Sequence, residues 1–455
     1  MYRTTLFPDW RDEKKNALAS FLNDTKSDAR KKSGGDPDSQ QQDEGQRAWV
    51  PPISMMAIVG YTRTQASQDP TGSPYKPNNN LVASPVSLFY GGAITEHVGA
   101  FAQVTWNNAP FGAPDQFDPF ATRQVTWDNT DVRYANNATL GGVNVSYGIT
   151  ANNNPTVQDP WNTTPAWSFP YNSSNVAPRP ATSTLIDGAL AQHVAGAGAY
   201  ALVNDILYLE LTGYRTINYD AQLKLGPDPF KAPGMNQGIM PYWRVAIEPH
   251  WGNHWLEFGT FGMSAQIHPW NIPQNIDPNT NLPIFYQNVT FPQTDKITDT
   301  AFDAQYQYQG PNYWFTLRGT YIHENQHLDS SSINLGTNPT NTLNTFRGYA
   351  SLAYGNDNRV VLTGQYFDTK GSSDATLYGG LASQFDPSGT PPTDPNSNGY
   401  IFDISYIPFI SSQSPIWPWA NMRVGLQYTY YNKFDGDTVF AKKNNTLFAY
   451  LWFAM

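Results

Sequence analysis

The chain has 455 residues, with 27 Lys plus Arg against 37 Asp plus Glu, a formal net charge of −10, no cysteine and 14% aromatic residues. Charged residues make up 14% of the chain, against about 25% in a typical soluble protein, so much of the surface is not solvated by ionised side chains. A mean hydropathy of −0.50 without long apolar runs excludes a helical membrane protein. The lack of a basic stripe excludes nucleic acid as a partner, and the lack of cysteine excludes disulfides and covalently attached c-type haem, so no cofactor is expected.

The first 50 residues differ in composition from the rest of the chain. They hold 18 of the 64 charged side chains, with helix formers in Arg11–Leu22 and a Ser, Gly, Asp and Gln tract from Ser33 to Gln46. We expect residues 1–50 to be a polar extension, helical or disordered, on the periplasmic side, and residues 51–455 to be a second unit. The start has no apolar core of a secretory signal, which leaves open whether a signal lies upstream.

From Trp49 onward, the main signal is two-residue alternation. Residues 302–309 place Phe302, Ala304, Tyr306 and Tyr308 on one face and Asp303, Gln305, Gln307 and Gln309 on the other. Residues 143–150, 243–248, 402–406 and 422–430 show the same division. Such runs predict strands with one apolar and one polar face.

The connections between these strands alternate between short and long. About sixteen strands are predicted, at residues 53–64, 81–93, 98–107, 129–135, 141–150, 190–203, 206–216, 241–248, 254–265, 298–309, 312–324, 344–355, 359–368, 399–407, 421–430 and 444–454. Short turns are expected at places such as Asn136–Leu140 and Asn356–Asn358, while Pro408–Ala420 is longer than the pattern requires. An all-β, antiparallel up-and-down transmembrane barrel with periplasmic turns and extracellular loops fits this pattern.

The bilayer explains which face should point outward. Hydrocarbon offers backbone groups no hydrogen bonds, so a sheet crosses it only when closed, with the apolar side chains toward lipid. We therefore expect the bacterial outer membrane as the location and its lipid as a partner. Aromatic girdles are expected at the two interfaces, from Trp106, Trp127, Tyr214, Trp251, Trp255, Tyr313, Trp314, Tyr366, Tyr430 and Tyr431.

The polar faces of the strands carry the candidate functional residues. Parity places a set of charged side chains inside the barrel as candidate pore-lining residues: Asp131, Arg133, Glu210, Arg244, Glu248, Glu257, Asp303, Arg318, Arg347, Asp403 and Arg423. Either they form a structural network of hydrogen bonds and ion pairs, or they line a pore for small solutes or ions with weak selectivity. The long connection Ala151–Thr184, rich in Pro and aromatic residues, is expected to pack against the inner wall or to cap the mouth.

No motif indicates an enzyme or a metal site. His323 and His327 match the spacing of zinc metalloproteases, but in a strand they would lie roughly 13 Å apart, too far to share one ion. His250 and His254 flank a tight turn and are expected to be surface residues. We therefore expect neither catalytic nor metal-binding residues.

Four segments resemble the barrel part of proteobacterial proteins in which cytochrome c is fused to an outer-membrane porin: Ser87–Gly92, Gly99–Thr105, Asp128–Ala135 and Asn152–Trp167. The resemblance implies the barrel, and it offers an alternative function as the scaffold of an electron-transfer system, with haem from another segment or a periplasmic cytochrome. The haem motif of that family is absent here. A homotrimer is an expectation by analogy with porins of this size, and a non-membrane all-β protein remains the third hypothesis.

Overall fold

A computed structural model of the chain describes residues 52–68, 75–107, 125–270, 290–355, 359–381, 383–390, 392–409, 416 and 420–455. The expected extension at residues 1–50 lies outside the described residues, as does most of the connection Pro408–Ala420.

One antiparallel sheet contains all eighteen strands found in the described part of the chain. Their bounds are β1 Ile53–Thr64, β2 Asn80–Ala93, β3 Val98–Trp106, β4 Val125–Leu140, β5 Val143–Asn152, β6 Val194–Val203, β7 Leu207–Thr216, β8 Gly234–Asn236, β9 Met240–Ile247, β10 His250–Trp251, β11 His254–Pro269, β12 Asp295–Gln309, β13 Tyr313–His327, β14 Thr340–Tyr354, β15 Val360–Gly371, β16 Ser397–Tyr406, β17 Asn421–Lys433 and β18 Thr446–Ala454.

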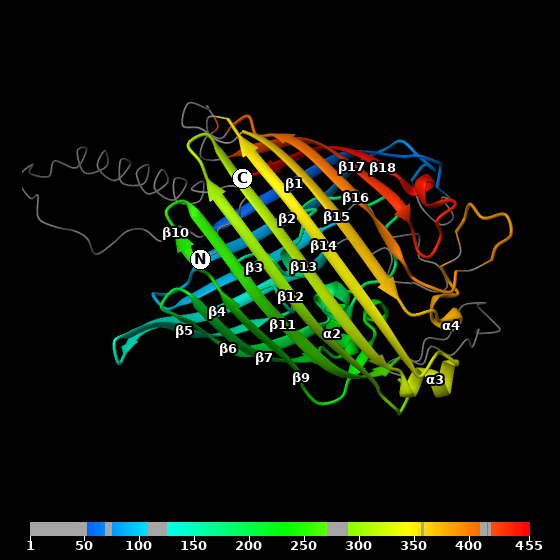
Figure 1. Ribbon diagram of the computed structural model, residues 1–455, viewed down its shortest axis with the longest axis horizontal. Helices are drawn as coiled ribbons and strands as arrows, with labels where there is room; N and C mark the ends of the chain where they lie inside the picture. Colours follow the sequence, from blue (N-terminus) through cyan, green and yellow to red (C-terminus); the bar gives the residue numbers. More distant parts are fainter. Residues whose placement is uncertain are drawn as a thin grey trace, which may run out of the picture.

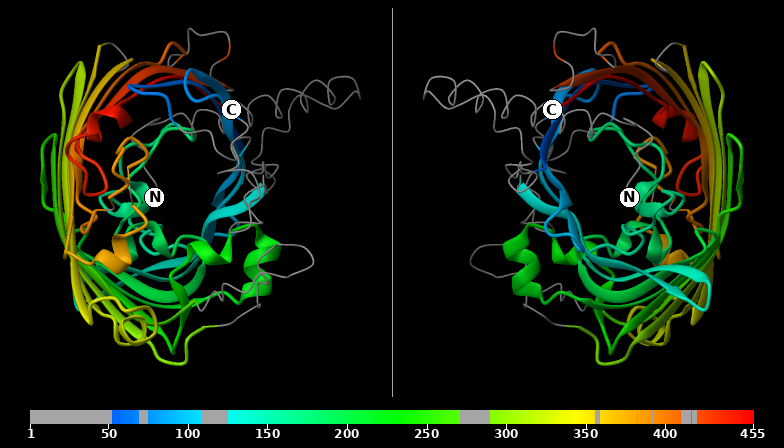
Figure 2. Two further views of the ribbon diagram at one scale, coloured as in Figure 1. Left: turned by 90° about the vertical axis from the view of Figure 1, so that its right-hand side faces the viewer. Right: turned by 90° about the vertical axis from the view of Figure 1, so that its left-hand side faces the viewer.

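The sheet closes on itself. β1 pairs with β2 on one side and with β18 on the other, and each other long strand pairs with its neighbours in chain order. The short β8 and β10 both pair with β11, next to β9, so the wall is a closed barrel of sixteen strands. Figures 1 and 2 show the tilted strands from the side and the closed ring from its two ends. The predicted fold class is confirmed.

The turn predicted at Asn136–Leu140 is wrong. β4 continues through these residues to Leu140, and the chain reverses at Gly141 and Gly142, whose φ angles are +59° and +84°. Two consecutive residues with positive φ are what a tight hairpin turn with the twist of its strands requires, and glycine adopts them without strain. Alternation alone did not show the boundary because Asn136–Leu140 are polar enough to resemble a loop.

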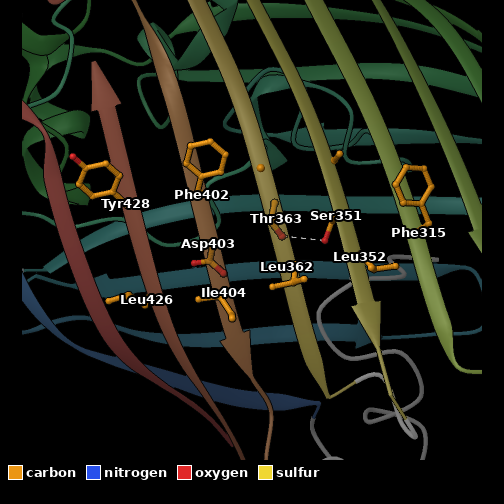
Figure 3. A pocket seen from close by; sticks show the side chains of 12 residues that line it. Phe315, Ser351, Leu352, Leu362, Thr363, Phe402, Asp403, Ile404, Leu426 and Tyr428 are labelled. Atoms are coloured by element: carbon orange, nitrogen blue, oxygen red, sulfur yellow. Dashed lines mark hydrogen bonds between the residues drawn. The ribbon is translucent and has the colours of Figure 1, made fainter. Parts of the chain in front are cut away.

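The outer surface of the barrel is apolar, as the alternation predicted. Phe302 of β12 is 60% exposed, Leu211 of β7 65% and Ile149 of β5 60%. A groove of about 500 Å³ crosses this face where Ala350 and Gly364 lack bulk, with Phe315 on one side and Phe402 on the other (Figure 3). A closed barrel with an apolar outer face is the form in which a sheet crosses the outer membrane of bacteria, and there the protein resides.

Aromatic side chains gather toward both ends of the outer face. The ring centroids of Tyr366 and Tyr400 lie 5.3 Å apart, nearer the end with the long loops. Those of Tyr308 and Tyr313 lie 5.6 Å apart, at the end with the tight turns. Four of the predicted girdle residues are wrong. Tyr214 and Tyr431 point inward and are buried, because they fall on the inner parity of β7 and β17. Trp255 and Trp314 likewise share the inner parity of Glu257 on β11 and of Arg318 on β13.

Short helical turns lie in the connections: η1 Pro165–Trp167, η2 Leu185–Ala189, α2 Tyr219–Leu225, η3 Pro229–Lys231, α3 Asp329–Leu335, α4 Ala375–Tyr378 and η5 Ala441–Asn444. None of the helices described has the length and apolar character needed to cross a membrane.

The connection between β5 and β6, residues 153–193, lies inside the ring of strands and is here called the inner segment (Figure 2). Its residues Leu185, Ile186 and Leu190 belong to the largest apolar cluster, together with inward-facing Phe261 and Met263 of β11. The expectation that this connection packs against the inner wall is confirmed. The main apolar core is therefore not a central one, but a layer between one side of the wall and the inner segment.

Candidate functional site

The eleven candidate residues all lie on the wall or at its edge, with Glu248 one residue beyond β9. Most of them are buried, and the structure gathers them into separate groups rather than one ring. Since they are covered by each other or by the inner segment, burial favours the structural-network alternative for most of the set.

Arg244 of β9 is the centre of the largest group, and its side chain is fully buried. Its guanidinium donates to both carboxylate oxygens of Asp303 at 3.0 and 2.8 Å and to Glu257 Oε1 at 3.1 Å. Its Nε lies 3.0 Å from Asp159 Oδ1 of the inner segment, and Trp161 of the same segment lies over the guanidinium, with its ring centroid 5.4 Å away. One cation thus joins three strands to the inner segment.

Glycine at position 259 leaves room for this group. A Cβ built on Gly259 would lie 2.5 Å from Asp303 Oδ1, 2.7 Å from Glu257 Oε1 and 3.0 Å from Arg244 Nη2. Any other residue would displace the carboxylates that hold Arg244, so the small size of Gly259 is part of the site.

A second group surrounds the start of the inner segment. Arg133 Nε donates to Asp131 Oδ2 at 2.6 Å, and Thr150 donates to Asp131 Oδ1 at 2.6 Å. Gln158 of the inner segment accepts through its carbonyl from Arg133 and donates through Nε2 to Glu210 at 2.6 Å. These bonds attach the inner segment to β4 and β7.

Arg318 and Arg347 hold the middle and the far part of the inner segment. Arg318 donates to the carbonyl of Asn162 at 3.2 Å and to the Tyr171 hydroxyl at 2.9 Å. Arg347 donates to both carboxylate oxygens of Asp187, and 32% of its side chain is exposed. Arg347 is therefore the most accessible arginine among the ion pairs of the candidate set.

Asp403 and Arg423 form a pair on the wall itself. Arg423 Nη2 lies 3.3 Å from Asp403 Oδ1, its Nε donates to Ser405 at 2.8 Å, and Tyr450 donates to Asp403 Oδ2 at 2.9 Å. All four residues belong to neighbouring strands β16, β17 and β18. Glu248, the last of the set, accepts from Trp161 Nε1 of the inner segment.

Sequence reasoning missed the partners that the inner segment supplies, above all Asp159 and Asp187, because a loop has no alternation to indicate where its side chains point. It also missed the neighbouring carboxyl groups of Asp299 and Glu324, which are buried inside the barrel. Their strand parity matches that of Asp303 and Arg318, and this could have identified them.

Two carboxyl groups outside the strands have shifted pKa values because of burial. Burial raises the pKa of Asp159, although Arg244 acts against the shift. Burial also raises the pKa of Asp435, in the connection after β17, to about 6, while the backbone N–H of Ala181, 3.0 Å from its Oδ1, partly offsets the effect. Both groups anchor the inner segment.

The two histidine pairs lie as the strand interpretation predicted. His323 and His327 are both in β13, four residues apart along an extended strand, and His323 Nδ1 bonds Asn344 at 2.7 Å. His250 and His254 stand at the turn between β10 and β11.

Neither a family model nor a curated protein matches the chain. Among solved structures, OmpF of Salmonella typhi in complex with daunomycin is similar over 89% of this chain and 97% of its own, with 12% identity and a TM-score of 0.44. OprB of Pseudomonas putida covers 89% and 93%, with 8% identity and a TM-score of 0.44. An anion-selective porin from Comamonas acidovorans covers 89% and 98%, with 9% identity and a TM-score of 0.44. The barrel assignment rests on the strand pairing, not on these likenesses.

Proposed function

We propose that the protein is a non-enzymatic, porin-like channel for passive and weakly selective passage of ions or small solutes. The observation that carries this proposal is the closed barrel of sixteen strands with an apolar outer and a polar inner face. Barrels of sixteen to eighteen strands are wide enough to leave an aqueous channel.

Weak selectivity follows from how the inward charges are arranged. Arg244, Arg347 and Arg423 each lie beside at least one carboxylate, and Arg244 and Arg423 are buried. Paired opposite charges produce little net potential at a distance, so a solute in the bore would meet hydroxyl, amide and aromatic groups more than fixed charge. The inner segment would narrow this passage from one side.

The absence of native cysteine allows a direct test with introduced thiols. Ser351 faces inward on β14, where it bonds Thr363 at 3.0 Å, whereas its neighbour Leu352 lines the lipid-facing groove. In planar bilayers, a charged methanethiosulfonate reagent should reduce the conductance of Ser351→Cys and leave that of Leu352→Cys unchanged. Equal effects at both positions, or no conductance in the unmodified protein, would contradict the proposal.

Selectivity is tested by the reversal potential under a salt gradient. We expect a value near zero for the native channel. Replacing half-exposed Arg347 by Gln should shift it toward cations, because Asp187 then loses its counter-charge. A strong anion preference of the native protein would contradict weak selectivity.

A further inference from the structure

Two neighbouring acids on the inner wall have no role in the function proposed above. Asp299 of β12 and Glu324 of β13 stand directly opposite each other in the strand register. Their residues are only 1% and 2% exposed. Opposed side chains on adjacent strands are separated by about 5 Å at Cβ, so the two carboxyl groups share one site.

The inner segment places two consecutive backbone N–H groups on this pair. Leu185 N donates to Glu324 Oε2, and Ile186 N donates to Asp299 Oδ2 at 2.7 Å. Gln326 donates to the other oxygen of Glu324 at 2.6 Å, while Asp299 Oδ1 is buried and has no hydrogen-bond partner among the described residues. The pair therefore holds the first residues of η2 against the wall.

The surroundings of the pair are apolar, and among the described residues neither acid was found in an ion pair. Leu185, Ile186, Ala301 and Ile322 pack in the same apolar cluster. Within the described part of the chain, the other titratable groups that act on the pair electrostatically are Asp187, His323 and Tyr378. Asp187 forms an ion pair with Arg347 of β14, and His323 points to the other face of β13, where it bonds Asn344. The Tyr378 hydroxyl is buried, and no hydrogen-bond partner for it was found in the described ranges.

Two carboxylates this close in an apolar site repel each other strongly when both are ionised, so the geometry favours a single proton shared between them. We propose that Asp299 and Glu324 form a proton-dependent clamp that holds residues 185–186 of the inner segment against the wall and releases them when the second carboxyl ionises at alkaline pH. A proton shared between the two acids gives the unpartnered Asp299 oxygen a hydrogen bond. Loss of this proton leaves two negative charges beside Leu185 and Ile186.

Hydrogen–deuterium exchange of the detergent-solubilised full chain measures the clamp without requiring channel activity. After correction for the intrinsic pH dependence of exchange, peptides containing Leu185 and Ile186 should exchange at least tenfold faster at pH 10 than at pH 6. Peptides containing Gln158, held by Glu210 and Arg133, should change much less.

Glu324→Gln tests the mechanism. The amide oxygen can still accept from Leu185, and the NH2 group takes the place of the oxygen that accepts from Gln326. If the Gln326 amide flips to present its own oxygen, the NH2 group can donate to it and to Asp299, so the variant should protect residues 185–186 equally at both pH values; Asp299→Asn should do the same. Asp403→Asn is the matched control, since it removes a buried inward carboxyl whose hydrogen bonds, as far as the structure describes them, come from Arg423 and Tyr450 of the wall, and it should keep the native pH response.

Protection of residues 185–186 that does not change from pH 6 to pH 10 in the native protein would overturn the clamp. A pH response that persists in Glu324→Gln and Asp299→Asn would also overturn it. The readout is independent of conductance, so a failure of the channel proposal would leave the clamp standing, and the reverse also holds.

Discussion

The two buried arginines Arg244 and Arg423 look alike in the sequence but do different work in the barrel. Each follows the inward parity of its strand, and each bonds a carboxylate of a neighbouring strand, Glu257 for Arg244 and Asp403 for Arg423. Arg244 also bonds Asp159 and Thr163 of the inner segment. The partners found for Arg423 are Asp403 and Ser405, and both of these belong to the wall. An inward charge therefore serves either as an anchor of the inner segment or as a brace between strands, and what lies over it decides which.

The largest effect is expected when the anchor is removed. Arg244→Met leaves Asp159, Glu257 and Asp303 buried around a missing cation, and breaking a buried ion pair in this way costs about 3 to 5 kcal/mol. We expect a large fall in the denaturant midpoint of the folded barrel, measured by heat-modifiable gel migration, and faster chymotryptic cleavage after Tyr171 in the inner segment. An unchanged midpoint would show that Arg244 does not anchor the segment.

The next largest effect concerns the space that the anchor needs. Gly259→Ala places a methyl group 2.5 Å from Asp303 Oδ1, while the matched change Gly319→Ala, on the lipid-facing side of β13, meets nothing within 4 Å. Overpacking of this kind costs about 1 to 3 kcal/mol. We expect a lower unfolding midpoint for Gly259→Ala alone; equal midpoints for both variants would contradict the crowding argument.

Removing the brace should have a smaller effect than removing the anchor. In Arg423→Met, Asp403 keeps the hydrogen bond from Tyr450, and one carboxyl group rather than three loses its cation. We expect a loss of about 1 to 2 kcal/mol in the free energy of unfolding and no change in proteolysis of the inner segment. Increased cleavage there would erase the distinction between brace and anchor.

The last expected effect is a pH dependence at Asp435, which bonds the inner segment at Ala181. Its pKa is raised to about 6 from an ordinary value of 3.8, so the folded protein binds more protons than the unfolded chain between these values. Its contribution to stability is therefore full below about pH 4 and is lost as pH rises through 6, an effect of at most about 3 kcal/mol.

Asp435→Asn should remove this dependence, because the amide imitates the protonated acid and can still accept from Ala181. Unfolding midpoints at pH 4, 5, 6 and 7, compared between the variant and the native protein, measure the difference. The variant should be the more stable at pH 7; a native-like slope in the variant would contradict the assignment.

Sequence and structure agree best where the physics is local. The positions of the sixteen strands and the outward direction of Phe302, Ile404 and Leu426 could be predicted, because a strand alternates its side chains with period two and lipid accepts only apolar ones. The inward parity of Arg244, Asp303 and Arg423 could be predicted for the same reason. The errors at Asn136–Leu140, Tyr214 and Tyr431 arose where polar residues continued a strand or aromatic residues faced inward.

Only the tertiary structure decided how the inward charges are used. Asp187 and Arg347 are 160 residues apart in the chain, and Leu185 and Glu324 are 139 apart. No local pattern links such partners, because their contact depends on where the inner segment, which has no repeating alternation, lies within the closed barrel. The alternation along the strands determined which charged side chains point into the barrel. The path of residues 153–193 determined which of them became anchors, braces or a carboxyl pair.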